Sequence, residues 1–235
     1  MTVDNAGMVI VGAGECGGRA AISLREYGWH GSITIIGQEP HPPYERPPLS
    51  KSFLTNTGEF PFRTNGDADR FETLGVEHLG ARKVASIDRA AQVVVTHEGT
   101  RVPYHRLLLA TGAYARRVTI PGGEKAMYLR TPVDAVRIKK GLSPGKRVAI
   151  IGGGLIGMEL AASAAALGCQ VTVIERQGRV LSRSTPSALA TIVEARHRSA
   201  GVEFIFGTGV TAIEDRSMGD SRSTSHHHST SKWIW

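Results

Sequence analysis

The sequence predicts an α/β protein made of two similar βαβ units, with a small antiparallel β insertion in the first. Two observations predict this class. A strand, a glycine turn, a helix and a strand follow one another over residues 8–36, and the same succession returns over residues 146–175. Between them, residues 84–97 hold two strand-like runs, VASID and QVVVTHE, separated by a turn.

The first unit begins with the apolar run MVIV at residues 8–11, which stops at the glycine-rich stretch GAGECGG. The helix that follows carries its apolar residues at helical spacing: Ala20, Ile22, Leu24 and Tyr27. The β-branched run SITII, residues 32–36, predicts the next strand. RLLLATG, residues 106–112, predicts a further strand that ends on a turn of small residues.

The second unit opens at residue 146 with a strand, a glycine turn, an alanine-rich helix and a strand, and GVEFIFGT at residues 201–208 adds one more strand. A linker rich in Gly, Pro and Arg lies at residues 113–124. We therefore expect a first domain at residues 1–113 and a second at residues 114–216.

Residues 217–235 differ in kind, being rich in Ser and Thr with a triple histidine, His226 to His228, and a terminal WIW. Such a composition predicts a disordered or non-native tail. Adjacent histidines on a flexible chain lack the fixed geometry of a metal site, so we expect no metal there.

Composition and charge argue against membrane-spanning, secreted and nucleic-acid-binding proteins. The chain has 235 residues, of which 41% are hydrophobic and 21% charged, as in a globular protein. No apolar run is long enough to cross a bilayer and no signal peptide is evident, so we expect a cytoplasmic protein without a membrane partner. The net charge of +7 favours acidic partners, but the basic residues are scattered, which argues against nucleic acid.

The first glycine turn has the spacing of a dinucleotide-binding fingerprint. Gly12 permits a tight turn, Gly14 lets the backbone approach a pyrophosphate, and Gly17 lets the helix pack close to the strand. The start of the helix then presents N–H groups and a positive dipole end to the phosphates. Glu39, at the end of the next strand, is the acid that would hold a ribose hydroxyl, and Gln38 beside it could share that role.

The second glycine turn repeats the fingerprint with Gly152, Gly154 and Gly157. Its acid is Glu175, 18 residues after the last glycine. Each turn has a strand, a helix, a second strand and an acid in place, so both units are predicted to be Rossmann-like and to bind nucleotides. The alternative for either turn alone is a glycine-rich turn in another α/β protein.

Glu175 also bears on the choice of nicotinamide nucleotide. A carboxylate at this place accepts from a free 2′-hydroxyl and repels a 2′-phosphate, which favours NADH over NADPH. Arg176 and Arg183 lie close in sequence and would soften this preference, unless they only face solvent.

Two dinucleotide sites in one chain suggest a flavin and a nicotinamide that exchange a hydride. The two cysteines, Cys16 and Cys169, are far apart, and no CxxC or Cx4C pair exists. Electrons would therefore leave the flavin for an outside acceptor.

Several stretches in the same order give the chain a resemblance to a known family. They are VGAGECGGRAA, ITIIGQEPHPPYERPPLSK, LLLATGA, YLRTPVDA and IIGGGLIGMELAA. They resemble the FAD-dependent NADH:ferredoxin reductases, the family of putidaredoxin and rhodocoxin reductases, over residues 8 to about 215. The resemblance implies FAD- and NAD(P)-binding units of the three-layer ββα type. It also implies electron transfer from NADH through FAD to an acidic ferredoxin-type iron–sulfur protein, as in the reductase components of ring-hydroxylating dioxygenases.

The resemblance gives a role to the proline-rich stretch PHPPYERPPLSK, residues 40–51. It implies that Lys51 lies beside the flavin N5 and that Glu159 pairs with it. Prolines fix φ and lower the entropy of a loop that must hold one group still. An ammonium there stabilises negative charge on a reduced ring. Taken alone, the residues favour a Lys51 that only opens the next helix in solvent, and it is the resemblance that favours the functional role.

The resemblance extends to further cofactor contacts. Thr111 and Gly112 resemble the turn that crosses the flavin diphosphate, Val84 resembles the residue that meets the adenine, and Arg130 resembles a flavin contact or, alternatively, a surface ion pair. The other positions that it assigns to the cofactors are Cys16, Arg46, Pro48, Ala110 and Ile156. The remaining histidines of the two units, among them His78, match no motif and are expected to be structural or solvated.

The chain departs from the family pattern near Glu214, where the family's return segment with its Gly-Asp motif and its C-terminal domain would follow. We therefore expect both units to be incomplete, and the chain to be C-terminally truncated. The alternative to a working reductase is then a catalytically inactive nucleotide-binding fragment, and flavin content distinguishes the two.

Overall fold

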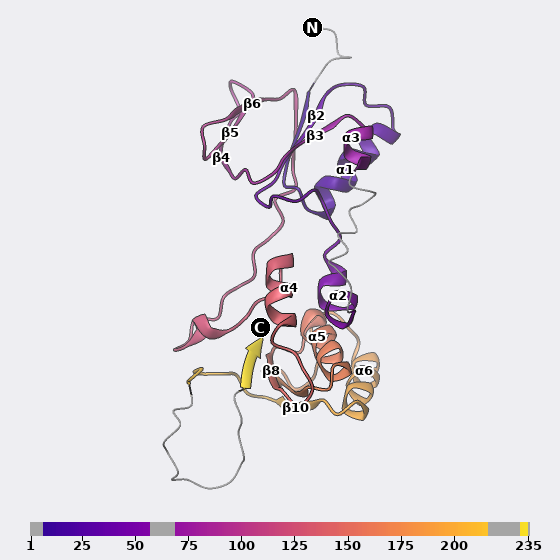
Figure 1. The fold of residues 1–235 in the computed structure, drawn as a ribbon, viewed down its shortest axis with the longest axis vertical. Helices are drawn as coiled ribbons and strands as arrows, with labels where there is room; N and C mark the ends of the chain where they lie inside the picture. The colour runs from indigo at the N-terminus through magenta and orange to yellow at the C-terminus, as the bar shows by residue number, and fades with distance from the viewer. Residues whose placement is uncertain (1–6, 57–68, 216–230, 235) are drawn as a thin grey trace. The chain divides into compact units, whose positions relative to one another are not determined.

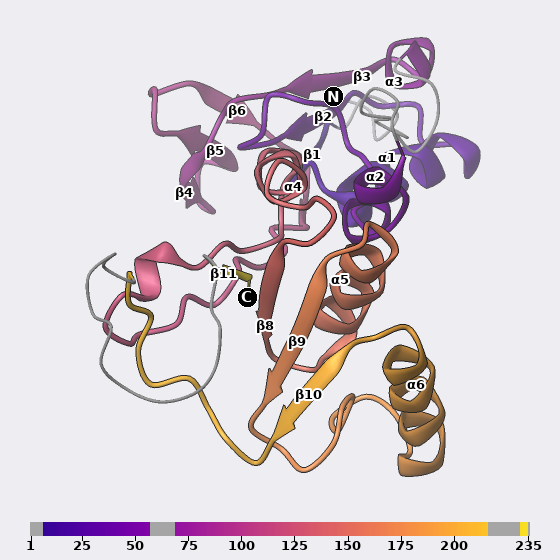
Figure 2. The ribbon, with the colours of Figure 1, turned by 60° about the horizontal axis from the view of Figure 1, so that its bottom comes forward.

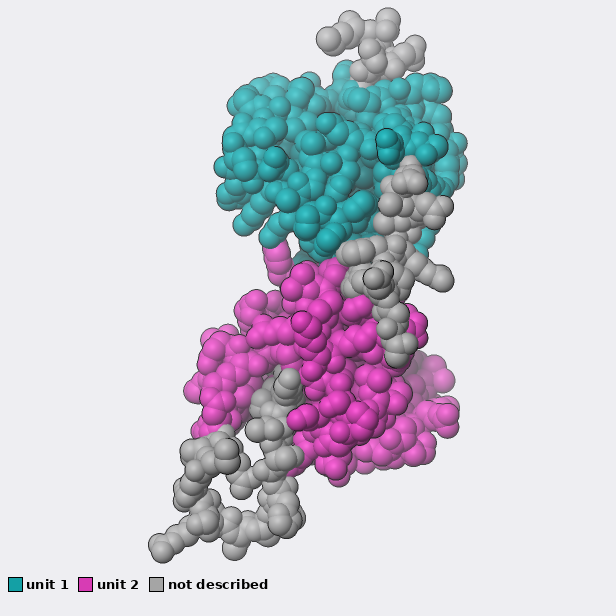
Figure 3. All heavy atoms as spheres, viewed as in Figure 1, with its two compact units in different colours: residues 1–46, 60–113 teal, residues 47–59, 114–235 magenta. Residues whose placement is uncertain are grey.

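The computed structural model describes residues 7–56, 69–215 and 231–234. The chain forms two compact units, which Figure 3 colours separately. Unit 1 holds Met1–Arg46 and Phe60–Ala113, and unit 2 holds Pro47–Glu59 and Tyr114–Trp235.

Unit 1 is built on a parallel sheet with the strand order β3-β2-β1-β7. Its strands are β1 (Met8–Val11), β2 (Ile33–Ile36), β3 (Val76–Leu79) and β7 (Arg106–Leu109). The register aligns Val11 with Ile36 and with Leu109, so that these three strands end at the same edge. This edge is where the glycine turn leaves β1.

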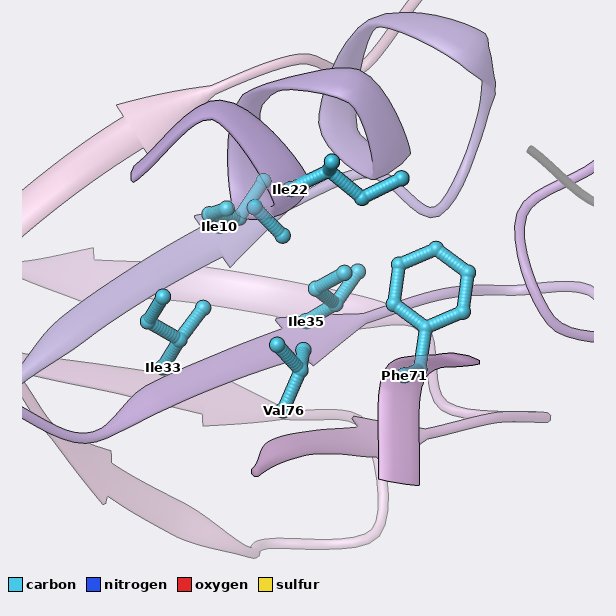
Figure 4. Packing of buried hydrophobic residues seen from close by; sticks show 7 residues of the cluster. Ile10, Ile22, Ile33, Ile35, Phe71 and Val76 are labelled. Carbon is cyan, nitrogen blue, oxygen red and sulfur yellow. The ribbon is translucent and has the colours of Figure 1, made fainter. Parts of the chain in front are cut away.

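Helices α1 (Glu15–Glu26) and α3 (Asp69–Thr73) cover one face of this sheet (Figure 1). Their contact is a cluster of buried apolar side chains: Ile10, Ala21, Ile22, Ile33, Ile35, Phe71 and Val76 (Figure 4). Ile10 and Ile35 are fully buried. Because strand side chains alternate between faces, the neighbours of these residues point to the other side of the sheet.

The opposite face is covered by an antiparallel sheet of β4 (Val84–Asp88), β5 (Val93–Thr96) and β6 (Arg101–Pro103). Val9, Val11 and Ile36 from the parallel sheet pack there against Val94 of β5. The unit is thus a helix layer, a parallel sheet and an antiparallel sheet. The predicted α/β class, with its ββα layers and antiparallel insertion, is confirmed.

Unit 2 repeats the parallel sheet, with the strand order β10-β9-β8-β11 (Figure 2). Its strands are β8 (Arg147–Ile151), β9 (Gln170–Glu175), β10 (Glu203–Phe206) and β11 (Ser231–Ile234). Its helices are η2 (Pro47–Ser50), α2 (Ser52–Thr55), η3 (Gly123–Lys125), α4 (Pro132–Lys139), α5 (Leu155–Ala166) and α6 (Ser187–Ser199).

Two features of unit 2 differ from the expectations. Pro47–Glu59, which the sequence analysis placed in the first domain, groups with the second unit. Ser231–Ile234, expected in a disordered or non-native tail, pair in parallel with β8. Averaging composition over the whole Ser-rich stretch hid the strand-forming residues at its end. Residues 216–230, which include the triple histidine, lie outside the described residues.

In the part of the chain that the structure describes, no helix is both long enough and apolar enough to cross a membrane.

Candidate functional site

The first glycine turn connects β1 to α1, and its three fingerprint glycines meet different surroundings. Gly12 has φ +117°, and a Cβ there would lie 2.1 Å from the carbonyl oxygen of Ala110. A Cβ on Gly17 would lie 2.0 Å from the carbonyl oxygen of Gly12. A Cβ on Gly14 would meet nothing within 4 Å. Two glycines therefore serve the chain's own packing, and Gly14 leaves open space beside the backbone.

Gly14 is also the N-cap of α1, and no side chain caps this helix. The N–H groups of a first helical turn have no partner within the helix and attract anions. Cys16 lies in this turn as an exposed free thiol. The neighbouring β7 ends at the same place, since the N–H of Ala110 donates to the carbonyl of Val11. Thr111 and Gly112, which continue from β7, are exposed.

The acid after β2 is Glu39, and two side chains already hold its carboxylate. Tyr44 donates its hydroxyl to Oε2 at 2.8 Å, and Arg46 donates to Oε1 at 2.7 Å. The guanidinium of Arg46 also lies 5.0 Å from the centre of the Tyr44 ring. A carboxylate has about four lone-pair sites, so each oxygen keeps room for a further donor. The proline-rich stretch thus orients this acid, a role that the fingerprint spacing did not reveal.

The end of β2 is also tied to the connection that leads into β4. Ala81 donates its N–H to the carbonyl of Glu39, and Arg82 donates to that of Gly37. These bonds bring the start of β4, with the half-buried Val84, close to the end of β2, where Gln38 is exposed.

His78, on β3, is expected from the sequence to be structural or solvated, and it lies at this same edge. Its Nε2 is buried without a hydrogen-bond partner among the described residues. A Cβ on Gly37 would lie 3.5 Å from that nitrogen, and one on Gly80 would lie 2.9 Å from the ring. Burial lowers the pKa of His78, which favours the neutral ring. No motif could have indicated it, because its place depends on strand register.

The second glycine turn, between β8 and α5, repeats the geometry of the first. Gly152 has φ +106°, and a Cβ on Gly157 would lie 2.1 Å from the carbonyl oxygen of Gly152. A Cβ on Gly154, the N-cap of α5, would meet nothing within 4 Å, and no side chain caps the helix. Leu155 and Ile156 follow as exposed apolar residues, 59% and 52% accessible. An open, uncapped helix start with an apolar rim suits a nucleotide with a diphosphate.

Glu175 ends β9 beside this turn, and the backbone orients it. Its Oε2 accepts from the N–H of Gly153 and its Oε1 from the N–H of Gln177, both at 2.7 Å. The bond to Gly153 ties the acid directly to the glycine turn. As at Glu39, each oxygen keeps a lone pair for a ribose hydroxyl.

The loop after Glu175 is organised by an arginine that sequence reasoning did not select. Arg179 donates to the carbonyl oxygens of Val180, Ser182 and Thr185, at 3.1 to 3.2 Å. Arg183, which the sequence analysis did select, is exposed on this loop.

Lys51 and Glu159 lie together in unit 2. The Lys51 ammonium is 2.8 Å from Glu159 Oε1, with 49% and 31% of the two side chains exposed. Ser50 donates its hydroxyl to Glu159 Oε2 at 2.5 Å. Pro48 lies in the short 3₁₀ helix η2, which ends at Ser50. The Lys51 amine is therefore half exposed, and the Glu159 carboxylate on α5 orients it.

Arg130 precedes α4, where Thr131 and Asp134 form a capping box. The backbone N–H of Arg130 donates to Asp134 Oδ2 at 3.1 Å, and the side chain is half-buried. The backbone of this residue is therefore fixed by the start of α4.

Each unit thus gathers its own set of predicted residues. In unit 1 these are the glycine turn, residues 110–112, Glu39 with Arg46, and Val84. In unit 2 they are the second glycine turn, Glu175, and Lys51 with Glu159. Their assignment to particular cofactor atoms stays a prediction. Within the described ranges, no three His, Cys, Asp or Glu side chains cluster to hold a metal ion.

Comparison with known proteins gives consistent relatives. The family model of the pyridine nucleotide-disulphide oxidoreductases matches residues 7–230. The ferredoxin–NAD(+) reductase component of the p-cumate 2,3-dioxygenase system of Pseudomonas putida is 39% identical over 217 residues, which are 92% of this chain and 54% of that protein. A rubredoxin–NAD(+) reductase of Pseudomonas putida is 40% identical, over 89% of this chain and 55% of that protein.

Solved structures agree. Putidaredoxin reductase in its covalent complex with putidaredoxin matches with a TM-score of 0.85 and 35% identity, covering 91% of this chain and 52% of that chain. The chain thus spans about half the length of the relatives it matches. Because the family model covers most of the chain, the chain belongs to the pyridine nucleotide-disulphide oxidoreductase family.

Proposed function

We propose that this chain carries the FAD-binding and NAD(H)-binding units of an NADH-dependent ferredoxin reductase. The observation that carries the proposal is the pair of glycine turns, each with one glycine that opens onto empty space at an uncapped helix start. A backbone shaped in this way accepts a pyrophosphate. Two such turns in one chain fit two dinucleotides.

Unit 1 would hold FAD. Gly14 and the first turn of α1 would receive the diphosphate, and Glu39, oriented by Tyr44 and Arg46, would accept from a ribose hydroxyl. Val84 would lie near the adenine. When bound, FAD supplies the ability to accept a hydride and to release electrons singly.

Unit 2 would hold NAD(H), with the diphosphate on Gly154 and the start of α5. Glu175 would accept from the 2′-hydroxyl of the adenosine ribose, and a 2′-phosphate would meet its charge. The Glu175 carboxylate accepts hydrogen bonds from two backbone N–H groups, so moving it away from a 2′-phosphate would break both bonds. This supports NADH as the preferred nucleotide.

Lys51 would contact the flavin ring and balance negative charge on it. Its ammonium donates to Glu159 and to the carbonyl of Pro47, and the side chain is 49% exposed, so one N–H remains for a further acceptor. The carboxylate keeps the amine charged and oriented. Arg130 would serve as a second contact of the same cofactor.

The electron acceptor would be a small iron–sulfur protein. Relatives named for ferredoxin and putidaredoxin support this class, as does the absence of a CxxC or Cx4C pair in the sequence. The net charge of +7 favours an acidic partner. The expectations of a cytoplasmic location, and of no nucleic-acid or membrane partner, stay predictions.

The test is a visible absorption spectrum of the purified chain supplied with FAD, before and after anaerobic NADH. We expect flavin bands that bleach with NADH in the unaltered chain and in Lys83→Met, a control at an exposed lysine of unit 1. Lys51→Met should retain the bands and bleach more slowly. A chain that stays colourless with added FAD contradicts the proposal for this chain and favours a nucleotide-binding fragment without activity.

A further inference from the structure

The segment that carries Lys51 is held in unit 2 by contacts other than the ion pair with Glu159. Residues 47–56 comprise η2, Lys51 and the four-residue helix α2. So short a helix has little stability of its own. Its position must therefore be imposed by the elements that it contacts, which are α4 and α5.

The first set of contacts comes from α5. Ser163 is buried, 6% exposed, and donates its hydroxyl to the backbone carbonyl of Ser50 at 2.7 Å. Glu159 lies four residues earlier, on the same face of the helix, and accepts from the Ser50 side chain. One turn of α5 therefore binds both the backbone and the side chain of Ser50, the residue directly before Lys51.

The second set comes from the end of α4. Lys139 donates to the carbonyl of Phe53 at 2.8 Å and to that of Asn56, and its ammonium lies 4.9 Å from the centre of the Phe53 ring. Phe53 is in α2, and Asn56 is its C-cap. The last carbonyls of a helix lack partners within the helix and attract cations. Lys139, on α4, thus caps the C-terminal end of α2.

We propose that Ser163 and Lys139 are positioning residues that fix the segment 47–56 on unit 2 and so keep the Lys51 amine on Glu159. Ser163 fixes the N-terminal side of Lys51 and Lys139 fixes the helix on its C-terminal side. When the contacts of Ser163 or those of Lys139 are removed, the backbone and the side chain of Lys51 become more mobile. The consequence for flavin chemistry rests on the proposed function, but the positioning itself needs no cofactor.

The test compares the reactivity of Lys51 with that of the exposed Lys83 in the full chain, by competitive acetylation followed by peptide mass spectrometry. Ser163→Ala and Lys139→Met remove one set of contacts each, and the exchange of Lys139 for Met keeps most of its apolar stem. The matched controls are Ser199→Ala, whose hydroxyl also donates to a backbone carbonyl but within α6, and Lys140→Met, at the exposed C-cap residue that follows α4.

In each of the two variants we expect acetylation of Lys51, relative to Lys83, to rise about fivefold, as the loss of a hydrogen bond worth ~1 kcal/mol predicts. Faster amide hydrogen exchange in residues 48–56 should accompany it. Both controls should match the unaltered chain, and Lys139→Arg, which keeps the cation, should restore slow labelling.

Unchanged Lys51 labelling in folded Ser163→Ala and Lys139→Met, as judged by circular dichroism, overturns the proposal. If one variant fails to fold, the other still decides, because each acts on a different side of Lys51. A chain that binds no FAD but shows the labelling change would refute the proposed function and leave the positioning intact.

Discussion

Gly154 and Gly157 belong to the same dinucleotide fingerprint, and the structure predicts that their replacement by alanine affects different properties. One exchange should weaken NADH binding, and the other should lower the stability of the fold. Gly154 has φ −79°, an angle that any residue adopts, and a Cβ there meets no atom within 4 Å. Gly157 lies inside the first turn of α5, and a Cβ there lies 2.1 Å from the backbone oxygen of Gly152. Gly154→Ala should therefore change the binding of a ligand, and Gly157→Ala should change the free energy of unfolding.

The magnitudes follow from these distances. Real Cβ contacts are essentially never under 3.0 Å, so Gly157→Ala must separate α5 from the glycine turn by about 0.9 Å. Overpacking of this kind costs roughly 1–3 kcal/mol in the free energy of unfolding. For a chain of this size that lowers the melting temperature by roughly 3–9 °C.

Gly154→Ala should cost less than ~1 kcal/mol, since only the helix-cap preference changes. Its methyl group, however, would occupy the space through which a diphosphate approaches the backbone. Losing one charge-assisted bond to the diphosphate costs about 1.5–3 kcal/mol. We therefore expect the Kd for NADH to rise at least about tenfold while the melting temperature falls by less than about 3 °C.

The assay is calorimetric titration with NADH together with thermal melting by circular dichroism. Gly14→Ala is the matched control, because it makes the same change in the turn of unit 1 and should leave NADH affinity unaltered. A Gly154→Ala chain that binds NADH as tightly as the unaltered chain would refute the placement of the diphosphate. A Gly157→Ala chain of unchanged stability would refute the packing argument.

Three further predictions concern single side chains. Because burial lowers the pKa of His78, the unfolded chain binds this proton more readily, so stability should fall as pH drops below about 6.5. His78→Leu should flatten that fall in urea unfolding, and an unchanged pH dependence contradicts this role of burial. Glu175→Gln should weaken NADH binding relative to NADPH binding, measured by titration; an unchanged ratio contradicts the role of the charge. Arg179→Met should lower the free energy of unfolding by roughly 1–3 kcal/mol, because three loop carbonyls lose a charged donor, whereas the exposed Arg176→Met should have little effect.

The parts of the molecule that sequence could predict are those set by local rules. The glycine spacing, the apolar runs and the acid after each second strand depend on neighbours along the chain, and the strand–turn–helix–strand order is present twice. The resemblance added the pairing of Lys51 with Glu159. Ser163 and Lys139 could not be found in this way, since each acts on a segment far away in sequence through a backbone carbonyl, which leaves no residue signature at the other end.

The two ribose acids show how far a spacing rule reaches. Glu39 and Glu175 occupy the same place in their units, yet Glu39 is held by the side chains of Tyr44 and Arg46, whereas Glu175 is held by backbone N–H groups. A change of residue 44 or 46 can therefore release Glu39, but no single side-chain change removes the bonds that orient Glu175. Nucleotide preference in unit 2 should thus follow the acid itself, and affinity in unit 1 should depend on the proline-rich stretch that positions its acid. Spacing identifies both carboxylates. Only the contacts around them show that the orientation of Glu39 can be changed by substituting a neighbouring side chain, whereas that of Glu175 cannot.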